Sequence, residues 1–178
     1  MNLVLIGYRG TGKSHIGRLV ARQLKMRCFS MDREIEKQAG RTIPEIVADD
    51  GWTVFRDLES DMVRRLTALD HVMLDTGGGV IERPENVAAL RKNSCVIWMT
   101  AGLDTIVTRI SSGIHRPSLT GDKSFTDEVA EVLERRNPLY RDASHYQVST
   151  DGREPEAIAA EIVDLWEQYR AAAGPRGK

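Results

Sequence analysis

One glycine-rich stretch near the N-terminus, residues 7–14 (GYRGTGKS), constrains the fold more than any other part of this sequence. It matches the phosphate-binding pattern G-x-x-x-x-G-K-[ST] at every fixed position. Residues 2–6 before it form a short apolar run typical of a buried strand, and residues 15–24 after it carry apolar side chains at helical spacing. This strand–turn–helix context favours a nucleotide-binding loop over an ordinary glycine turn.

The same stretch predicts which atoms bind the phosphates. Its glycines let backbone N–H groups approach phosphate oxygens without a Cβ in the way. The start of the following helix adds positive potential. Lys13 is expected to reach the β- and γ-phosphates, and the Ser14 hydroxyl is expected to ligate Mg²⁺. The residues predicted to contact ATP here are Gly10, Thr11, Gly12, Lys13, Ser14 and His15.

The charge balance indicates what kind of molecule binds in addition to the nucleotide. The chain of 178 residues has 25 basic and 26 acidic residues and a formal net charge of -1, so it has no overall positive field to attract nucleic acid. A small substrate is therefore favoured over a polyanion. The start of the chain lacks a signal-peptide pattern, and no apolar run approaches membrane-spanning length, so a cytoplasmic location is expected. No long surplus amphipathic face indicates an obligate partner, so a monomer is expected. Cys28 and Cys95 fall in expected strands and are predicted to be buried free thiols.

Strands and helices alternate along the chain, which predicts an α/β domain with a parallel sheet. We expect the second strand to lie beside the first, and ligands to gather at the C-terminal ends of the strands. A helix over 52–69 should bury Val54 with its apolar face, and Thr42 and Glu45 should form a capping box. The expected strands are 2–6, 27–30, 71–75, 94–99 and 145–148, and the expected helices are 15–24, 31–36, 52–69, 84–90, 103–110, 126–140 and 155–169.

Several residues near expected strand ends are candidates for binding the substrate. Asp32 follows the second strand, where its carboxylate could take a proton from a substrate hydroxyl, although an aspartate there is also a common helix cap. Residues 77–79 are three glycines that permit close approach of a ligand or simply form a turn. Arg56, Arg116 and Arg136 could bind anions, although single surface arginines are usually solvated.

Taken together, these motifs closely resemble the shikimate kinase family. In order they are the phosphate-binding loop, D-x-x-I-E over 32–36, F-R at 55–56, G-G-G at 77–79, R-P at 116–117 and R-x-P-L-Y over 136–140. The resemblance covers residues 2–169. It implies a P-loop NTPase-type fold of three α/β/α layers, with a central five-stranded parallel sheet, a helical substrate-binding subdomain and a lid loop.

The resemblance also implies an activity and a role for each matching residue. The activity is transfer of the ATP γ-phosphoryl group to the 3-hydroxyl of shikimate, with Mg²⁺ as cofactor. The implied catalytic residues are Lys13, Asp32 and Arg116. The implied shikimate-binding residues are Asp32, Arg56, Gly77, Gly78, Gly79 and Arg136. Arg109, Arg116 and Arg153 match positions that bind ATP in the family.

The chain departs from the family pattern at one acidic position. The family usually has an aspartate where this chain has Ser30, and that aspartate helps to organise water around Mg²⁺. Asp75 ends the third expected strand, where relatives usually have a small polar residue. We expect the first and third strands to be neighbours, which would place Asp75 near Ser14. The hypothesis is that Asp75, directly or through water, supplies the missing metal-binding carboxylate; the alternative is that it caps the turn.

The expected organisation is a single kinase domain over 1–170, with substrate-binding helices at 32–69, a lid at 111–124 and a frayed tail at 171–178. Two other functions remain open from the residues. The chain could be another small-molecule kinase, such as a gluconate or nucleoside monophosphate kinase. The altered position at Ser30 also leaves open a nucleotide-binding protein without kinase activity.

Overall fold

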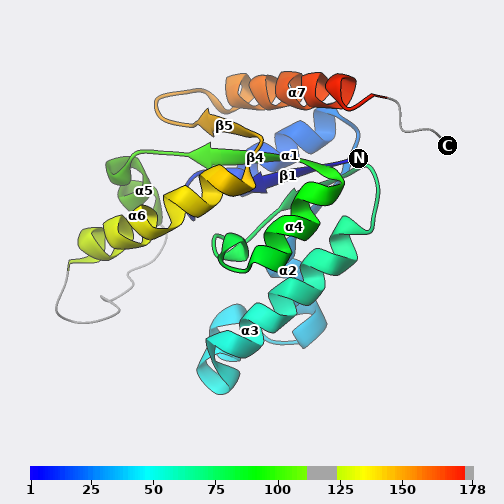
Figure 1. Cartoon of the computed structure of the whole chain (residues 1–178). Coiled ribbons are helices and arrows are strands. Elements are labelled where there is room, and N and C mark those ends of the chain that lie inside the picture. The colour runs from blue at the N-terminus through cyan, green and yellow to red at the C-terminus, as the bar shows by residue number, and fades with distance from the viewer. Residues whose placement is uncertain (112–123, 175–178) are drawn as a thin grey trace.

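A five-stranded parallel sheet organises the computed structural model, which describes residues 1–111 and 124–174 (Figure 1). The strand order is β2-β3-β1-β4-β5, and every neighbouring pair is parallel. The expected α/β class and the parallel sheet are therefore confirmed. The strands are β1 (Asn2–Ile6), β2 (Arg27–Ser30), β3 (Val72–Asp75), β4 (Ser94–Thr100) and β5 (Tyr146–Ser149).

Helices connect the strands close to the positions that the sequence predicts. The glycine loop leads into α1, and the three-residue 3₁₀ turn η1 follows the triple glycine. The helices of the described residues are α1 (Lys13–Gln23), α2 (Met31–Ala39), α3 (Ile43–Thr67), α4 (Pro84–Lys92), α5 (Leu103–Ser111), α6 (Phe125–Ala143) and α7 (Pro155–Ala172), and η1 spans Val80–Glu82.

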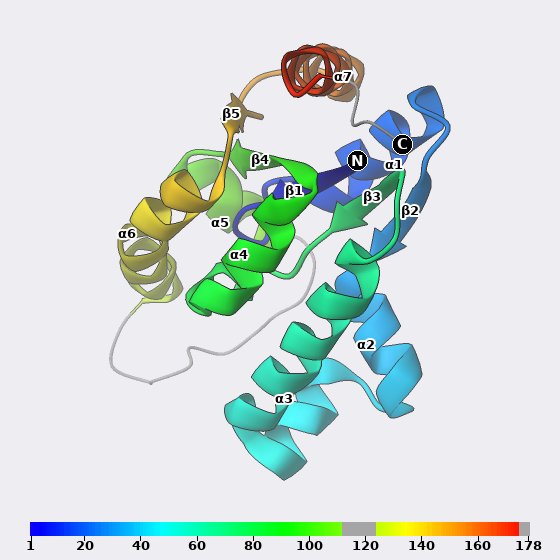
Figure 2. The same cartoon turned by 45° about the vertical axis from the view of Figure 1, so that its right-hand side comes forward.

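The sheet is buried on both faces because its strands are apolar at consecutive positions. Leu3 and Leu5 of β1 pack in one cluster with residues of α1 and α7. Val4 and Ile6 point to the opposite face and pack in a second cluster with residues of α3, α4 and α6. Figure 2 shows α7 above the sheet and α4 and α6 on its other side. This is the three-layer arrangement that the family resemblance implies.

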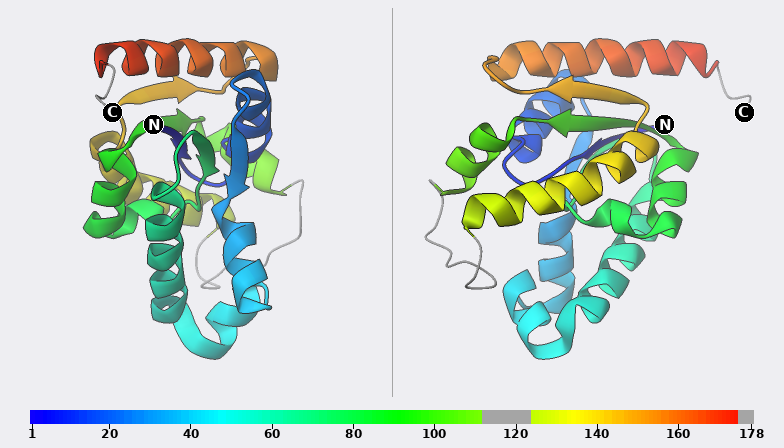
Figure 3. Two further views of the ribbon diagram at one scale, coloured as in Figure 1. Left: turned by 90° about the vertical axis from the view of Figure 1, so that its right-hand side faces the viewer. Right: turned by 60° about the vertical axis from the view of Figure 1, so that its left-hand side comes forward.

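Helices α2 and α3 form an arm that projects away from the sheet in all views (Figure 3). The predicted capping box is present: the Thr42 hydroxyl accepts the backbone N–H of Glu45, and the Glu45 carboxylate accepts the N–H of Thr42. Gly51 interrupts α3 with φ 84° and ψ 169°, a backbone conformation that favours glycine. The sequence therefore predicted the helix start at Thr42 and the helix from Trp52, whereas the kink at Gly51 that joins them is a finding of the structure.

Several sequence-based predictions about the fold are wrong. The second strand does not lie beside the first, because β3 lies between them. Cys28 is exposed, since β2 is an edge strand, whereas Cys95 is buried as expected. Val54 does not join the buried face, because that face follows Phe55 and Met62, and the Val54 side chain is 39% exposed near the tip of the arm. Helix α7 continues to Ala172 through two alanines of the expected tail.

The expected lid over 111–124 falls almost entirely outside the described residues and stays a prediction. Within residues 1–111 and 124–174, no helix is both long and apolar enough to span a membrane.

Candidate active site

The predicted phosphate-binding loop lies between β1 and α1, as its motif requires. Gly10 and Gly12 have φ values of 82° and 87°, which a residue with a Cβ rarely adopts. The Thr11 hydroxyl donates a hydrogen bond to the Tyr8 carbonyl at 2.7 Å, which braces the loop from within. The loop therefore turns its backbone N–H groups to one side at the start of α1, where anions bind well.

Lys13 is buried, and its ammonium group lies over the loop. It donates hydrogen bonds to the carbonyl oxygens of Gly7 at 2.8 Å and Tyr8 at 3.0 Å. Burial lowers the pKa of Lys13, while the carboxylates of Asp75 and Asp32 act in the opposite direction. A positive charge is thus held beside the position where the motif places the β- and γ-phosphates.

One cavity of about 450 Å³ joins the phosphate-binding loop to the predicted substrate residues. Three parts of the chain at and after the ends of β1, β2 and β3 meet in it with Arg109 of α5, at the edge where parallel sheets bind ligands. The cavity is lined by Arg9, Gly10, Gly12, Lys13, Ser14, His15, Arg18, Ser30, Asp32, Asp75, Thr76, Gly77, Gly78 and Arg109. It therefore gathers most of the predicted ATP residues with Asp32 and two of the three glycines.

Asp32 is a side chain of this cavity and not a helix cap. The N-cap of α2 is Ser30, and Asp32 lies in the first turn of the helix. Burial raises the pKa of Asp32, and the nearby carboxylate of Asp75 raises it further, against the effect of Lys13. A carboxyl group with a raised pKa accepts a proton from a substrate more readily than an ordinary exposed one.

Asp75 occupies the end of β3 between two partner strands. It is in register with Leu5 of β1 on one side and with Ser30 of β2 on the other. Residues in register on parallel strands project from the same face of a sheet, so Asp75 lies one strand away from Ser30 on that face. The expectation that the first and third strands are neighbours is confirmed.

The residues around Asp75 fit Mg²⁺ in their chemistry. Ser14, Ser30 and Asp75 all line the cavity and offer the oxygen donors that Mg²⁺ prefers. Among residues 1–111 and 124–174, no group of three or more His, Cys, Asp or Glu side chains is arranged to hold a metal ion. This agrees with the usual binding of Mg²⁺, which takes one or two protein ligands together with substrate phosphates and water.

The three glycines allow side chains to approach the backbone closely. A Cβ on Gly77 would lie 2.8 Å from Asp32 Oδ1 and 3.1 Å from Glu59 Oε1, and a Cβ on Gly79 would overlap the Arg56 guanidinium. None of the three has a positive φ. Gly77 and Gly79 are therefore required by the close approach of these side chains, and not by a positive φ, whereas a Cβ on Gly78 would meet nothing closer than 3.6 Å.

The two predicted substrate arginines come from different helices, and both contact the carboxylate of Glu82. Arg56 of α3 donates to Glu59 Oε2 at 2.6 Å, and Arg136 of α6 donates through Nε to Glu82 Oε1 at 2.9 Å. Their side chains are only 13% and 14% exposed, so neither is an ordinary solvated arginine. Neither lines the cavity that holds the phosphate-binding loop.

The remaining ATP residues have different positions. Arg109 lines the cavity and donates to the Gly10 carbonyl at 3.1 Å and to the Thr150 hydroxyl at 3.0 Å. Arg153 lies outside the cavity lining, where it forms an ion pair with Glu161 at 2.6 Å and donates to the Ser149 carbonyl. Arg116 falls outside the described residues.

Reasoning from the sequence missed three residues of this region. Glu59 is buried, its Oε1 has no hydrogen-bond partner among the residues that the structure describes, and that oxygen faces Gly77 beside Asp32. Burial raises the pKa of Glu59, and Arg56 opposes this shift. Glu82 contacts both arginines, and the Tyr140 hydroxyl donates to the Gly78 carbonyl. The spacing of Glu59, one helical turn after Arg56, and the place of Tyr140 at the end of R-x-P-L-Y were signals that the sequence offered, whereas Glu82 had none.

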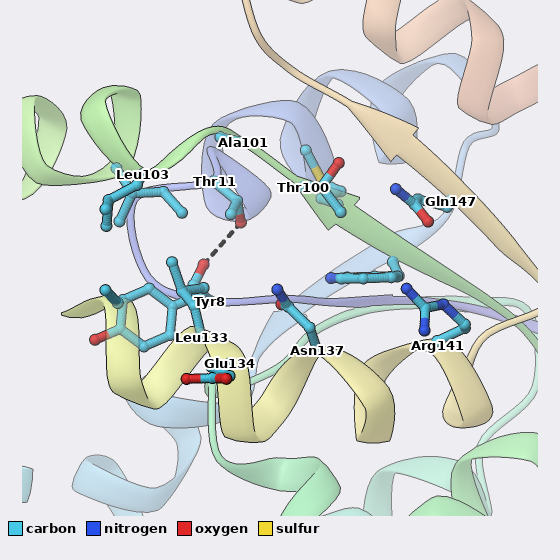
Figure 4. A pocket seen from close by; sticks show the side chains of 14 residues that line it. Tyr8, Thr11, Thr100, Ala101, Leu103, Leu133, Glu134, Asn137, Arg141 and Gln147 are labelled. Carbon is cyan, nitrogen blue, oxygen red and sulfur yellow. Dashed lines mark hydrogen bonds between the residues drawn. The ribbon is translucent and has the colours of Figure 1, made fainter. Parts of the chain in front are cut away.

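A second cavity of about 520 Å³ lies behind the loop, between β4 and α6 (Figure 4). Its lining includes Tyr8, Thr11, Leu133, Asn137 and Gln147. Among the described residues, Thr11 alone of the predicted site residues belongs to that lining. Lys13, Asp32, Asp75 and Arg109 line the first cavity instead, whereas Arg56, Arg136 and Arg153 line neither.

The comparison with known proteins identifies the family. Residues 9–167 match the family described as "Shikimate kinase". A shikimate kinase of Persephonella marina is 36% identical over 162 residues, which cover 91% of this chain and 96% of that protein. One of Pseudomonas entomophila is 39% identical over 168 residues, with coverage of 94% and 96%.

A solved structure agrees with this result. The structure is a shikimate kinase from Acinetobacter baumannii in complex with shikimate, and it superposes with a TM-score of 0.88. The two sequences are 30% identical, and the match covers 95% of this chain and 94% of that one. Together with the site geometry, these matches show that the chain belongs to the shikimate kinase family.

Proposed function

We propose that this protein transfers the γ-phosphoryl group of ATP to the 3-hydroxyl of shikimate, giving shikimate 3-phosphate and ADP on the route to chorismate and the aromatic amino acids. The observation that supports this most strongly is the cavity that brings Lys13 and Ser14 together with Asp32, Gly77 and Gly78. A donor phosphate on the loop and an acceptor hydroxyl beside Asp32 would share this one cavity. We expect the protein to act as a cytoplasmic monomer.

The acceptor would be oriented from both ends. Arg56 and Arg136 are expected to bind the shikimate carboxylate, because guanidinium groups match the planar geometry of a carboxylate. The ring would lie against the backbone of Gly77, Gly78 and Gly79, with its hydroxyls toward Asp32. This arrangement converts transfer into a reaction between positioned groups, which is the main source of catalysis in phosphoryl transfer.

Asp32 is the proposed base for the 3-hydroxyl. Its raised pKa, caused first by burial and then by Asp75, improves its ability to take the proton as the new O–P bond forms. Lys13 would stabilise negative charge on the transferring group and on the leaving ADP. The roles proposed for Arg109 and Arg153 in binding ATP and for Arg116 in stabilising the transferring phosphoryl group rest on the family resemblance.

Ser14 and Asp75 are the proposed protein ligands for Mg²⁺, with Asp75 acting directly or through a water molecule. When bound, Mg²⁺ would neutralise charge on the β- and γ-phosphate oxygens.

The proposed function is tested by measuring ADP release with ATP and Mg²⁺, in the presence and absence of shikimate. We expect release that depends on shikimate, together with formation of shikimate 3-phosphate. Gluconate and nucleoside monophosphates serve as control acceptors. ATP binding without shikimate-dependent turnover would contradict the proposal and would favour a non-catalytic nucleotide-binding protein.

A further inference from the structure

Glu82 connects the two arginines that are proposed to bind the substrate carboxylate. Its Oε1 lies 2.7 Å from Arg136 Nη2, and its Oε2 lies 3.6 Å from Arg56 Nη2. Oε1 also lies 3.2 Å from Arg135 Nη2, although the Arg135 side chain is 67% exposed. One carboxylate thus bridges α3 and α6 from η1, the turn that follows the glycines.

These contacts lower the positive charge that the arginines present to an anion. Arg56 and Arg136 are each largely buried, and each pairs with a carboxylate. The carboxylate of Glu59 is 1% exposed and pairs with Arg56, whereas that of Glu82 is 28% exposed and contacts both arginines. The group of two arginines and two glutamates therefore has a formal charge near zero.

Glu82 also occupies donors that an incoming anion would use. Arg136 directs both Nε and Nη2 to Glu82 Oε1, and this pair of donors is one of the forks by which arginine binds carboxylates. Arg56 has one terminal nitrogen near Glu59 and the other near Glu82. An anion that binds between the two arginines must therefore share their N–H donors with the glutamates, and it is repelled by the nearby negative charge of Glu82.

We propose that Glu82 is a specificity-determining residue that weakens anion binding between Arg56 and Arg136, and does so more for doubly than for singly charged anions. This inference rests on the proposed function for the identity of the singly charged ligand, a small hydroxylated carboxylate. Glu82 belongs to the arginine group itself, so its charge acts at contact distance and is only partly screened by solvent.

The charge argument predicts a relation between two affinities. The repulsion from Glu82 scales with the charge of the anion at a given position. If replacing Glu82 with an uncharged residue strengthens binding of a monocarboxylate by some factor, binding of a dianion at the same position strengthens by about the square of that factor. A purely structural role for Glu82 predicts no such relation, because loosened arginines would weaken both ligands.

The experiment compares the natural protein with Glu82→Gln by calorimetry. Saturating ADP covers the phosphate-binding loop, and ionic strength is held constant with sodium chloride. Dissociation constants are measured for shikimate and, by competition with it, for sulfate. We expect Glu82→Gln to bind shikimate about three- to tenfold more tightly, which is the size of one partly screened ionic contact. Sulfate binding should strengthen by about the square of that factor.

Two further variants separate charge from structure. Glu82→Asp keeps the negative charge on a shorter side chain, so its shikimate affinity should stay within about twofold of the natural protein. Glu85→Gln removes a carboxylate from an exposed position on α4 and should leave both affinities unchanged.

Unchanged or weaker shikimate binding by a folded Glu82→Gln protein would overturn the inference, as would equal strengthening of the shikimate and sulfate affinities. These outcomes leave the proposed function intact if the natural protein phosphorylates shikimate. The proposed function fails separately if the natural protein shows no shikimate-dependent turnover.

Discussion

At the scale of single residues, the position of Asp75 bears most directly on the proposed chemistry. Its side chain is 5% exposed, it lines the cavity with Ser14, and it is in register with Ser30. The strand register therefore supports the hypothesis that Asp75 supplies the metal-binding carboxylate that the family has at the position of Ser30, one strand away along the same edge of the sheet. It gives less support to Asp75 as a turn cap, because among the described residues no backbone N–H of the turn donates a hydrogen bond to its carboxylate.

Replacing Asp75 by asparagine tests this role. We expect Asp75→Asn to raise the Mg²⁺ concentration for half-maximal activity about tenfold or more and to lower kcat, because an amide is a poorer ligand for Mg²⁺ than a carboxylate. Mg²⁺-dependent tightening of ADP binding, measured by calorimetry, should weaken as well.

The double variant Ser30→Asp/Asp75→Asn provides the matched control. It restores a carboxylate one strand away and should recover part of the Mg²⁺ affinity. If Asp75→Asn barely changes the Mg²⁺ requirement or kcat, Asp75 is not the metal-binding carboxylate.

At the scale of secondary-structure elements, α6 connects the substrate arginine to the glycine turn. Arg136 and Tyr140 lie four residues apart on this helix and so share one face. The Tyr140 ring is fully buried and stacks on Trp98, with ring centroids 5.8 Å apart, and its hydroxyl donates to the Gly78 carbonyl. The tyrosine therefore sets the position of the glycine turn relative to Arg136.

We expect Tyr140→Phe to raise the KM for shikimate about three- to tenfold and to change the KM for ATP much less. The variant leaves the Gly78 carbonyl without its partner, a loss of about 1–3 kcal/mol that would loosen the proposed ring-binding turn. Steady-state kinetics with each substrate varied in turn provide the measurement.

Tyr169→Phe is the comparison for this experiment, since it removes a hydroxyl near His145 Nε2, away from the site. Equal increases of both KM values in Tyr140→Phe, or no change in either, would argue against a positioning role.

His145 secures the start of the edge strand β5. Its Nδ1 accepts the backbone N–H of Val96 at 2.9 Å, which requires that nitrogen to be unprotonated. Burial, and secondarily Arg91, lowers the pKa of His145. The folded protein therefore holds this ring neutral at pH values where the unfolded chain would protonate it.

A specific pH dependence of stability follows. Because the pKa of His145 is lowered in the folded state, its contribution to the free energy of unfolding is fully present above the ordinary histidine pKa of about 6.5. This contribution is lost as the pH drops through the pKa that His145 has in the folded state. We expect the free energy of unfolding by urea to decrease between pH 7.5 and pH 5.5, and less steeply in His145→Gln. His71→Asn, at an exposed position, should keep the slope of the natural protein. Identical slopes for the natural protein and His145→Gln would exclude this explanation.

At the scale of the whole molecule, the proposed substrate site lies between the arm and the sheet. Asp32 and Arg56 belong to the arm helices, whereas Gly79 and Arg136 belong to the sheet side. The arm is kinked at Gly51, and Trp52 beside the kink is 61% exposed. A ligand that contacts both sides would therefore restrain the arm.

We expect saturating shikimate to slow amide hydrogen exchange in α2 and in α3 up to Phe55, because bound ligand opposes local opening of the elements that it bridges. ADP alone should instead slow exchange in residues 7–14. If shikimate left exchange in the arm unchanged, the arm would not be a substrate-binding element. The same measurement tests the expected lid over 111–124.

The sequence by itself determined the local structure and the class of chemistry. The glycine motif with its flanking strand and helix predicted the loop geometry, and Thr42 with Glu45 predicted a helix start, because such signals depend on hydrogen bonds between residues close in the chain. The six ordered motifs also identified the family. For the three glycines the sequence offered close approach of a ligand or a tight turn, and the structure shows the side chains of Asp32 and Arg56 close to Gly77 and Gly79.

Only the tertiary structure decided which distant residues meet. The place of β3 between β1 and β2, the exposure of Cys28 and the alignment of Asp75 with Ser30 all follow from the order of strands in the sheet. The contacts of Glu82 with Arg56 and Arg136 join three elements that are far apart in the sequence. Strand order and such contacts depend on packing across the whole core, which local spacing does not specify.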